Sequence, residues 1–409
     1  MKSVCVFSHK SFIPPTSGHN IASFNMLTGL AKEGVAVYFY TYGQKIREFQ
    51  YAGVNVHIYP FPRLAKLLFQ NRLFKRLMGH AKNYEAYLCL SSLSPNFVSF
   101  ASKEIAKSDL VLVEHIWCSF FPLLYARLFR KPVVVIDRNV ETLLSRRFLK
   151  THGPKSTKFL LFLRLMYTSL LERFSCSLAT RVYVRSKNDK LALNAYFGVP
   201  LHKVEILPPS VDTSRMKNNP RLGMSFRKKL QIPSQALVIC FLGDLRTVPN
   251  YLSAKYIVEH IARDVLAEHR ETFFLIVGRY IEIPPSFVEN SRVIFTNEVS
   301  NLTPFLSSAN ICIAPMTLGS GVKNKILTYF SFGKPVISTP IGMEGVGVKN
   351  GKEAIICSLE EFAKEILRLA LDPELRSTLG RSGRRFVEEN YEKSLITKRL
   401  IATLSEVAC

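Results

Sequence analysis

The sequence lacks any run of about 20 consecutive apolar residues, the length that a membrane-spanning helix needs. The longest apolar stretch, Phe159–Leu171, is interrupted by Arg164. The apolar run from Met1 to His9 is too short for a signal peptide and leads straight into patterned sequence. These absences exclude an integral membrane protein and favour one that is soluble or bound at a membrane surface.

Residue patterns that hold metals or build disulfide frameworks are also missing. The eight cysteines include no C-x-x-C pair, and Cys5, Cys240 and Cys312 lie inside apolar runs, where cysteine behaves as a small hydrophobic residue. No cysteine spacing suits zinc. No D-x-D-like carboxylate pair is evident, and Asp244 is too isolated to act as a ligand. We therefore expect reduced cysteines, a cytoplasmic protein, and no metal or other cofactor.

Acidic residues are scarce, mainly in the first half of the chain. The 409 residues include 55 Lys and Arg against 31 Asp and Glu, for a net charge of +24. Residues 1–218 hold 31 of the basic and 12 of the acidic residues, so this half carries +19. Such a surface attracts an anionic partner: an acidic lipid surface, a polyprenyl phosphate or nucleic acid. The alternative is that the excess of Lys and Arg only keeps the protein soluble.

Apolar runs of strand length alternate with helical patterns along the whole chain. With 47% hydrophobic residues and a length suited to two domains, this alternation predicts parallel sheets covered on both faces. In the first half, strands are expected at 4–8, 35–41, 54–59, 110–114, 133–137, 181–184 and 204–207, with helices at 21–32, 117–128 and 187–196. In the second half, strands are expected at 237–242, 273–277, 293–296, 311–314, 336–339 and 354–357, with helices at 254–266, 322–332, 360–370 and 374–389.

The predicted fold class is α/β, with two Rossmann-like, doubly wound parallel-sheet domains facing a cleft at the carboxyl ends of both sheets. Pro208 and Pro209 open a polar stretch that suits an interdomain linker. The expected domains are residues 1–212 and 213–390. A C-terminal helix at 391–409 is expected to pack back toward the first domain.

Two stretches of the first half combine basic residues with apolar residues at helical spacing. They are residues 61–82 (FPRLAKLLFQNRLFKRLMGHAK) and 146–173. A basic amphipathic helix suits a membrane interface. Either stretch alone is more simply an ordinary domain helix with its apolar face in the core. The pair, on a domain that carries +19, predicts contact with an anionic membrane surface.

The densest chemical signal is the segment 314–340 (APMTLGSGVKNKILTYFSFGKPVISTP). A strand is followed by a loop with Gly319 and Gly321 and then by a helix. Small residues let backbone amides approach a ligand closely, and the start of a helix presents unpaired N–H groups. Lys323 and Lys325 add positive charge, so the segment predicts a diphosphate site. The alternative is a plain loop whose glycines serve only turn geometry.

This segment resembles the donor-binding region of the large family of retaining GT-B glycosyltransferases, of the group 1 and family 4 type. In that family a strand ending in proline leads to G-S-G-x-[RK]-x-K-[IV]-L-E and then to G-K-P-V-[IV]-S-T. Other segments match in the same order. They are 239–250 (ICFLGDLRTVPN), 274–278 (FLIVG), 293–305 and 380–391 (GRSGRRFVEENY) in the second half and, more loosely, 14–30, 138–141 and 207–212 in the first.

The resemblance implies that a sugar is transferred with retention from a nucleotide-sugar to an acceptor. Charge builds on the leaving diphosphate, so catalysis rests on groups aimed at that charge. The donor-binding residues implied are Gly243, Arg246, Gly278, Ser320, Gly321, Val322, Lys323, Lys325 and Thr328. The acceptor-binding residues implied are Gly18, His19 and Asn139.

Two positions depart from the family's pattern. Relatives have two glutamates separated by seven residues, and the corresponding positions here are Ser320 and Thr328. Serine is frequent at the first position in the G-S-G branch. The second glutamate binds the ribose, and a neutral hydroxyl at Thr328 makes a weaker hydrogen bond, so donor affinity or identity is altered. Arg138 replaces the histidine of an H-N-V-E turn. It cannot exchange protons at neutral pH, but it can stabilise phosphate charge.

Arg138 and His115 are the predicted catalytic residues. Arg138 is expected to reach the phosphates from across the cleft. His115, His19 and His9 stand at expected strand–loop junctions, where a histidine can contact the acceptor or act as a base. A lone histidine is more often only hydrogen-bonded locally. Glu114 ends an apolar strand and is either a site residue or a solvated loop residue.

The predicted partners are a nucleotide-sugar donor, a lipid-linked or glycan acceptor, and the anionic inner face of a membrane. Because Thr328 stands where relatives have a glutamate, a second class of protein stays open. This is a catalytically impaired GT-B protein that acts as a binding or scaffold partner. A nucleic-acid-binding protein fits poorly, because no recognised module is evident. An epimerase or phosphorylase on the same fold is a lesser alternative.

Overall fold

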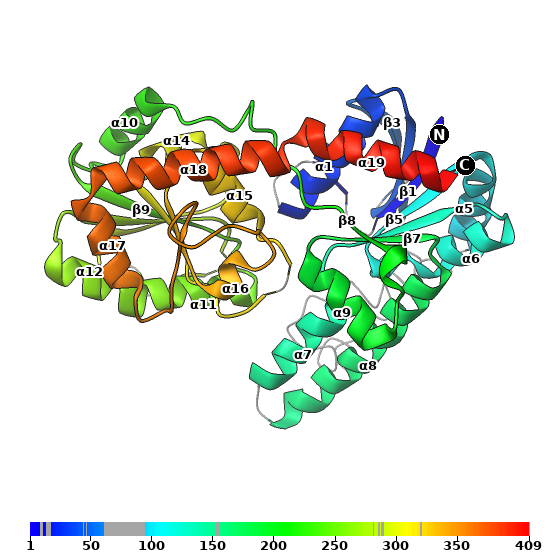
Figure 1. Cartoon of the computed structure of the whole chain (residues 1–409), viewed down its shortest axis with the longest axis horizontal. Helices are drawn as coiled ribbons and strands as arrows, with labels where there is room; N and C mark the ends of the chain where they lie inside the picture. The colour runs from blue at the N-terminus through cyan, green and yellow to red at the C-terminus, as the bar shows by residue number, and fades with distance from the viewer. Residues whose placement is uncertain are drawn as a thin grey trace. The chain divides into compact units, whose positions relative to one another are not determined.

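The chain folds into two α/β units, each built on its own β-sheet (Figure 1). The first unit comprises Met1–Pro208 and Ser394–Cys409, and the second comprises Pro209–Lys393. The structure is a computed structural model that describes residues 1–8, 11–13, 18–43, 45, 47–60, 95–151, 155–280, 282–284, 287, 290–319 and 321–408.

The sheet of the first unit has eight strands in the order β3-β4-β2-β1-β5-β6-β7-β8. Neighbouring strands are parallel except for β3, which pairs antiparallel with β4. The strands are β1 (Ser3–Ser8), β2 (Ala36–Gly43), β3 (Arg47–Tyr51), β4 (Val54–Pro60), β5 (Leu110–Glu114), β6 (Val133–Asp137), β7 (Arg181–Val184) and β8 (Val204–Ile206). The central strands β5 and β6 are fully buried, as parallel strands covered on both faces must be.

Helices cover both faces of this sheet. Alternate residues of β1 enter opposite hydrophobic clusters, with Cys5 and Phe7 on one face and Val4 and Val6 on the other. Leu400 of the C-terminal helix packs in the same cluster as Val4. The helices are α1 (Gly18–Lys32), α5 (Pro95–Lys107), α6 (Phe120–Leu128), α7 (Glu141–Thr151), α8 (Lys155–Leu178), α9 (Lys187–Phe197) and α19 (Lys393–Ala408), with 3-10 turns at Ile116–Cys118 and Leu201–Lys203.

The sheet of the second unit has six parallel strands in the order β11-β10-β9-β12-β13-β14. The chain builds one half of the sheet outward from β9 and then returns to build the other half from β12. The topological switch point therefore lies between β9 and β12. The strands are β9 (Leu237–Leu242), β10 (Thr272–Val277), β11 (Val293–Thr296), β12 (Ile311–Ala314), β13 (Val336–Ser338) and β14 (Ile355–Ile356).

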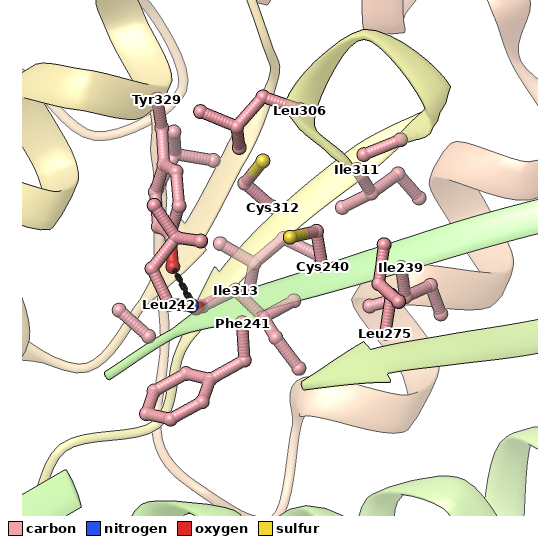
Figure 2. Packing of buried hydrophobic residues seen from close by; sticks show 14 of the residues in the cluster. Ile239, Cys240, Phe241, Leu242, Leu275, Leu306, Ile311, Cys312, Ile313 and Tyr329 are labelled. Atoms are coloured by element: carbon pink, nitrogen blue, oxygen red, sulfur yellow. Dashed lines mark hydrogen bonds between the residues drawn. The ribbon is translucent and has the colours of Figure 1, made fainter. Parts of the chain in front are cut away.

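The core of the second unit joins the switch-point strands to a helix. Figure 2 shows the Tyr329 hydroxyl accepting a hydrogen bond from the backbone N–H of Leu242 at 2.7 Å, and the same hydroxyl lies 3.4 Å from the carbonyl oxygen of Ile313. These contacts fix α15 against the ends of β9 and β12. The helices are α10 (Pro220–Lys229), α11 (Val248–Tyr256), α12 (Ala262–Glu268), α14 (Thr303–Ser308), α15 (Asn324–Ser331), α16 (Pro340–Met343), α17 (Phe362–Leu371) and α18 (Pro373–Tyr391), with a π-helical turn at Ile257–Ile261 between α11 and α12.

The predicted fold class of two parallel-sheet α/β domains is confirmed, and the central strands fall where the sequence predicts them. Several details differ. Strand β3 was not predicted, because all five of its residues are exposed and it shows no apolar run. The helix expected at 117–128 is divided into a 3-10 turn and α6. The helix expected from Val322 begins at Asn324, after Lys323 as its N-cap residue.

Three further sequence expectations concern cysteines, membrane spans and metals. The six cysteines in the described part of the chain are all free. Within that part, no helix is both long enough and apolar enough to cross a membrane. The described residues also contain no group of three or more His, Cys, Asp or Glu side chains that could hold a metal ion. The basic amphipathic stretch at 61–82 lies outside the described residues.

Candidate functional site

The carboxyl ends of β9 and β12 mark the switch point of the second sheet. Open α/β sheets bind ligands outside this edge, where the loops after two neighbouring strands diverge. The loop after β9 contains Gly243 and Arg246, and the loop after β12 contains Gly319 and Gly321. Residues that are about 75 positions apart in the sequence thus meet at one edge, as the hydrogen bond between Asn250 and Lys325 shows.

Gly243 and Gly278 hold the loops after β9 and β10 against each other. A Cβ atom on Gly278 would lie 2.0 Å from the carbonyl oxygen of Gly243, and Gly278 has φ 149°. A Cβ atom on Gly243 would lie 2.8 Å from Cγ of Asn250. Only glycine fits position 278, because of backbone packing, whereas a side chain at position 243 would have to displace that of Asn250. Their predicted contact with a donor stays a prediction.

The glycine turn after β12 leads into helix α15. Gly319 and Gly321 have φ 138° and 63°, a region that favours glycine. Ser320 lies outside the described residues. Because α15 begins at Asn324, the amides of Gly321 and Val322 belong to the turn rather than to the first turn of the helix. They precede the helix N-terminus, a position where backbone N–H groups bind anions.

The ammonium group of Lys323 is held within this turn. Its Nζ donates to the carbonyl oxygen of Gly321 at 2.6 Å and lies 3.8 Å from Oε2 of Glu344. Both side chains are largely buried, at 9% and 15% exposed. The sequence predicts that the charge of Lys323 serves a ligand, but Glu344 balances part of that charge. Glu344 was not identified from the sequence.

Lys325 differs from Lys323 because its described partners are neutral. Its Nζ donates to Oδ1 of Asn250 at 2.7 Å and lies 4.1 Å from the ring centroid of Phe241. The sulfur of Met316 is 3.6 Å away. Burial, and then the nearby charge of Lys323, lower the pKa of Lys325 to about 7. An anion placed beside this ammonium group would be stabilised by it and would raise its pKa again.

Arg246 and Thr328 are engaged within the unit. The guanidinium of Arg246 makes two hydrogen bonds to the Asp244 carboxylate, at 2.8 and 2.5 Å. Burial raises the pKa of Asp244, but the hydrogen bonds and charge of Arg246 outweigh it and hold that pKa below its usual value. Thr328 is buried, and its hydroxyl donates to the carbonyl oxygen of Asn324 at 3.0 Å, one turn earlier in α15. No carboxylate stands at this position.

In the first unit, the predicted catalytic residue Arg138 follows β6 and is buried against Glu114 at the end of β5. Nη2 of Arg138 pairs with Oε1 of Glu114 and also donates to Oγ of Ser23 at 2.7 Å. The Ser23 hydroxyl donates in turn to Oε2 of Glu114 at 2.9 Å. Glu114 is fully buried, so the interpretation of a solvated loop residue is wrong. The charge of Arg138 is neutralised inside the unit.

His115 is buried next to this pair and has an unusual backbone. Its φ of 86° is a strained value for a residue with a side chain, and such strain is concentrated at functional positions. Its Nε2 lies 3.4 Å from Oε1 of Glu141, at the start of α7. Glu141 also faces Arg164 of α8, with Oε2 3.8 Å from Nη2. Burial raises the pKa of Glu141, but the hydrogen bond and charge of His115, followed by Arg164 and Asn139, outweigh it and hold that pKa below its usual value.

Two buried carboxylic acids of this cluster were missed by the sequence analysis. Glu172 of α8 accepts hydrogen bonds from the backbone N–H groups of Glu141 and Thr142, at 2.7 and 3.1 Å, and so caps the N-terminus of α7. Burial raises the pKa of Glu172 to about 7. Asp137 is also fully buried, and burial together with the neighbouring Glu172 raises its pKa well above the usual range.

The predicted acceptor residues Gly18 and His19 form the start of α1, so His19 stands in a helix and not at a strand–loop junction. Asn139 lies in the turn between β6 and α7. His9 lies outside the described residues. The structure thus brings together His115, Arg138 and Asn139 in the first unit. In the second unit it brings together Gly243, Gly278 and the segment after β12.

Comparison with known proteins assigns a related domain to each half of the chain. The family model "Glycosyl transferases group 1" matches residues 236–372, and "Glycosyltransferase Family 4" matches residues 16–215. Among curated proteins, an "uncharacterized 44.6 kDa protein in cps region" of Klebsiella pneumoniae is 33% identical over 87 residues, 21% of this chain and 22% of that protein. The capsular polysaccharide biosynthesis glycosyltransferase CapM of Staphylococcus aureus is 29% identical over 115 residues, 27% of this chain and 30% of CapM. The matched segments thus span less than a third of each relative.

Solved structures match the chain over its full length. Sucrose-phosphate synthase from Thermosynechococcus elongatus has a TM-score of 0.75 at 15% identity, covering 100% of this chain and 99% of that one. Anabaena HepE in complex with UDP-glucose has a TM-score of 0.70 at 14% identity, covering 99% and 100%. At this level of identity the likeness establishes the fold, which is GT-B, with a glycosyltransferase domain matched in each half.

Proposed function

We propose that this chain, a GT-B protein with a glycosyltransferase domain matched in each half, transfers a sugar from a nucleotide-sugar to a glycan or lipid-linked acceptor. The observation that carries the proposal is the position of Lys325. It lies beside a glycine turn at the switch point of the second sheet, and its described partners are neutral. A diphosphate is the ligand that this arrangement of amides and ammonium groups suits best.

The chain's part in the reaction is to stabilise charge on the leaving diphosphate. We expect Lys325 to contact the phosphates directly, with support from the amides of Gly321 and Val322. Preorganised cations and amides act most strongly where charge develops in the transition state. Arg246 can contribute the N–H donors that Asp244 leaves unused. We infer transfer with retention from the resemblance of the 314–340 segment to retaining relatives.

A UDP-sugar is the first donor to test, because solved structures with this fold were obtained with UDP-glucose and with UDP-2-fluoro glucose. We expect no metal requirement, since lysine ammonium groups supply the positive charge. The acceptor proposal rests on the match to the capsular polysaccharide enzyme CapM and on the basic first half of the chain. Together they suggest a membrane-associated glycan acceptor, a cytoplasmic protein at the inner face of the membrane, and no role for nucleic acid.

Calorimetry with a panel of nucleotide-sugars tests the donor site, followed by release of nucleoside diphosphate in the presence of membrane extracts. We expect one donor to bind, and Lys325→Ala to lower turnover by about 100-fold, as expected for loss of one charge-stabilising group. Lys255→Ala, on the exposed surface of α11, is the control and should leave turnover unchanged.

Unchanged turnover in Lys325→Ala would remove this residue from the site. If the wild-type protein binds no nucleotide-sugar and releases no nucleoside diphosphate, the enzyme proposal fails. The catalytically impaired binding partner, suggested by Thr328, then becomes the better account.

A further inference from the structure

Helix α8 of the first unit exposes an apolar face along its middle turns. Phe159, Phe162, Leu163, Met166 and Leu170 are between 46% and 65% exposed. They recur at spacings of three and four residues, so they form one line on the helix surface, here called the apolar ridge. Soluble monomers rarely expose contiguous large apolar side chains, and such a patch indicates a contact surface.

The opposite, buried face of α8 contains several polar residues. Thr168, Glu172 and Ser175 are fully buried on this face. Glu172 caps α7, and Arg164 faces Glu141. A helix of a soluble domain normally shows the reverse arrangement, with its apolar stripe in the core. Polar groups thus take up part of the inner face of α8, beside the buried Leu171 and Cys176, while the large apolar side chains of the ridge stay on the outside.

The charge around the ridge is of one sign. Helices α7 and α8 pack side by side (Figure 1). Residues 141–178, which contain both helices, hold seven Lys and Arg and two Glu. Both glutamates, Glu141 and Glu172, are buried, so the exposed charge of this helix pair is positive. Lys158 and Arg173 are exposed on α8 near the two ends of the ridge.

We propose that the apolar ridge inserts into the interfacial region of an anionic lipid bilayer, with Lys158 and Arg173 placed to contact headgroups. One apolar helix face flanked by Lys and Arg matches the geometry of helices that lie in the plane of a membrane interface. Exposed positive charge, without exposed acid on the helix pair, complements an anionic leaflet. The inference rests on the proposed function in one respect, because binding of the ridge to a membrane would bring the enzyme to a membrane-associated acceptor.

Vesicle flotation of the full-length protein tests the ridge. The vesicles contain phosphatidylcholine with or without phosphatidylglycerol. We expect the wild-type protein to float with anionic vesicles, and Phe162→Ser/Met166→Ser/Leu170→Ser to lose at least about tenfold in partitioning, because three apolar side chains no longer insert into the bilayer. Leu371→Ser is the matched control, since Leu371 is 84% exposed in the second unit. High salt should weaken wild-type binding without abolishing it.

Folding of the triple variant can be followed with Trp117, the chain's only tryptophan, whose ring centroid lies 6.0 Å from that of Tyr167 on α8. An unchanged emission spectrum shows that α8 is still packed. Equal flotation of the triple variant and the wild type would overturn the proposal. So would a wild-type dimer that binds no vesicles and dissociates in the triple variant, because the ridge would then bind protein. Donor binding is measured on the same samples, and its absence from the wild type counts against the proposed function alone.

Discussion

The two units use charge differently at the carboxyl ends of their sheets. In the first unit, Arg138 is buried against Glu114, and His115 lies against Glu141. In the second unit, Lys325 lies among an amide oxygen, a thioether and an aromatic ring. The first unit thus balances its charges internally, whereas the second retains an ammonium group that an anion can neutralise. We infer that the charges of the first cluster mainly stabilise the fold and that Lys325 mainly serves a ligand.

The largest effect should come from breaking the buried ion pair of the first unit. Glu114→Gln leaves Arg138 buried without its counter-charge, and we expect a loss of about 3–5 kcal/mol in the free energy of unfolding. Urea unfolding followed by Trp117 fluorescence measures this in the first unit. Glu205→Gln is the control, because its pairing with Arg181 is partly exposed and should contribute less than about 1 kcal/mol. Equal losses in the two variants would show that the buried pair has no special structural role.

A second effect concerns the pH dependence of the first unit's stability. The pKa of Asp137 is raised in the folded state, so the folded protein holds a proton that the unfolded chain releases above about pH 4. Stability should therefore fall as pH rises from about 4, and Glu172, with a pKa of about 7, adds to the fall in the same direction. Asp137→Asn should reduce this loss between pH 5 and 8 in urea unfolding. An identical pH profile in the variant would contradict the shifted pKa.

The residues of the two sites also show which features the sequence could predict and which it could not. The glycine turn and Lys325 lie in one short segment, so a local pattern predicted them. Ser23 precedes Glu114 by 91 positions and Arg138 by 115, and Glu114 precedes Arg138 by 24. Only the tertiary fold, with α1 packed on the sheet, brings them together. Asn250 and Lys325 meet for the same reason. Glu172 could not be identified as a cap, because its position in a basic amphipathic pattern indicated only a helix.

The smallest effect should come from introducing the carboxylate that the family resemblance predicts at position 328. Thr328→Glu replaces a neutral hydroxyl with a charged acceptor, and we expect donor affinity to rise by roughly fivefold. Calorimetry with the best donor measures it, and Thr328→Ser, which keeps a neutral hydroxyl, should leave the affinity unchanged. Weaker donor binding in Thr328→Glu would indicate that α15 does not present this position to the ribose.

Proton uptake on donor binding tests most directly whether Lys325 holds the diphosphate. With a pKa of about 7, Lys325 is mostly neutral at pH 8 and mostly charged at pH 6. A bound diphosphate raises this pKa, so calorimetry in two buffers of different ionisation enthalpy should reveal proton uptake at pH 8 and little at pH 6. Lys325→Met should bind the donor more weakly and take up no proton at pH 8. Equal proton uptake by the wild type and Lys325→Met, or none by the wild type, would contradict the assignment.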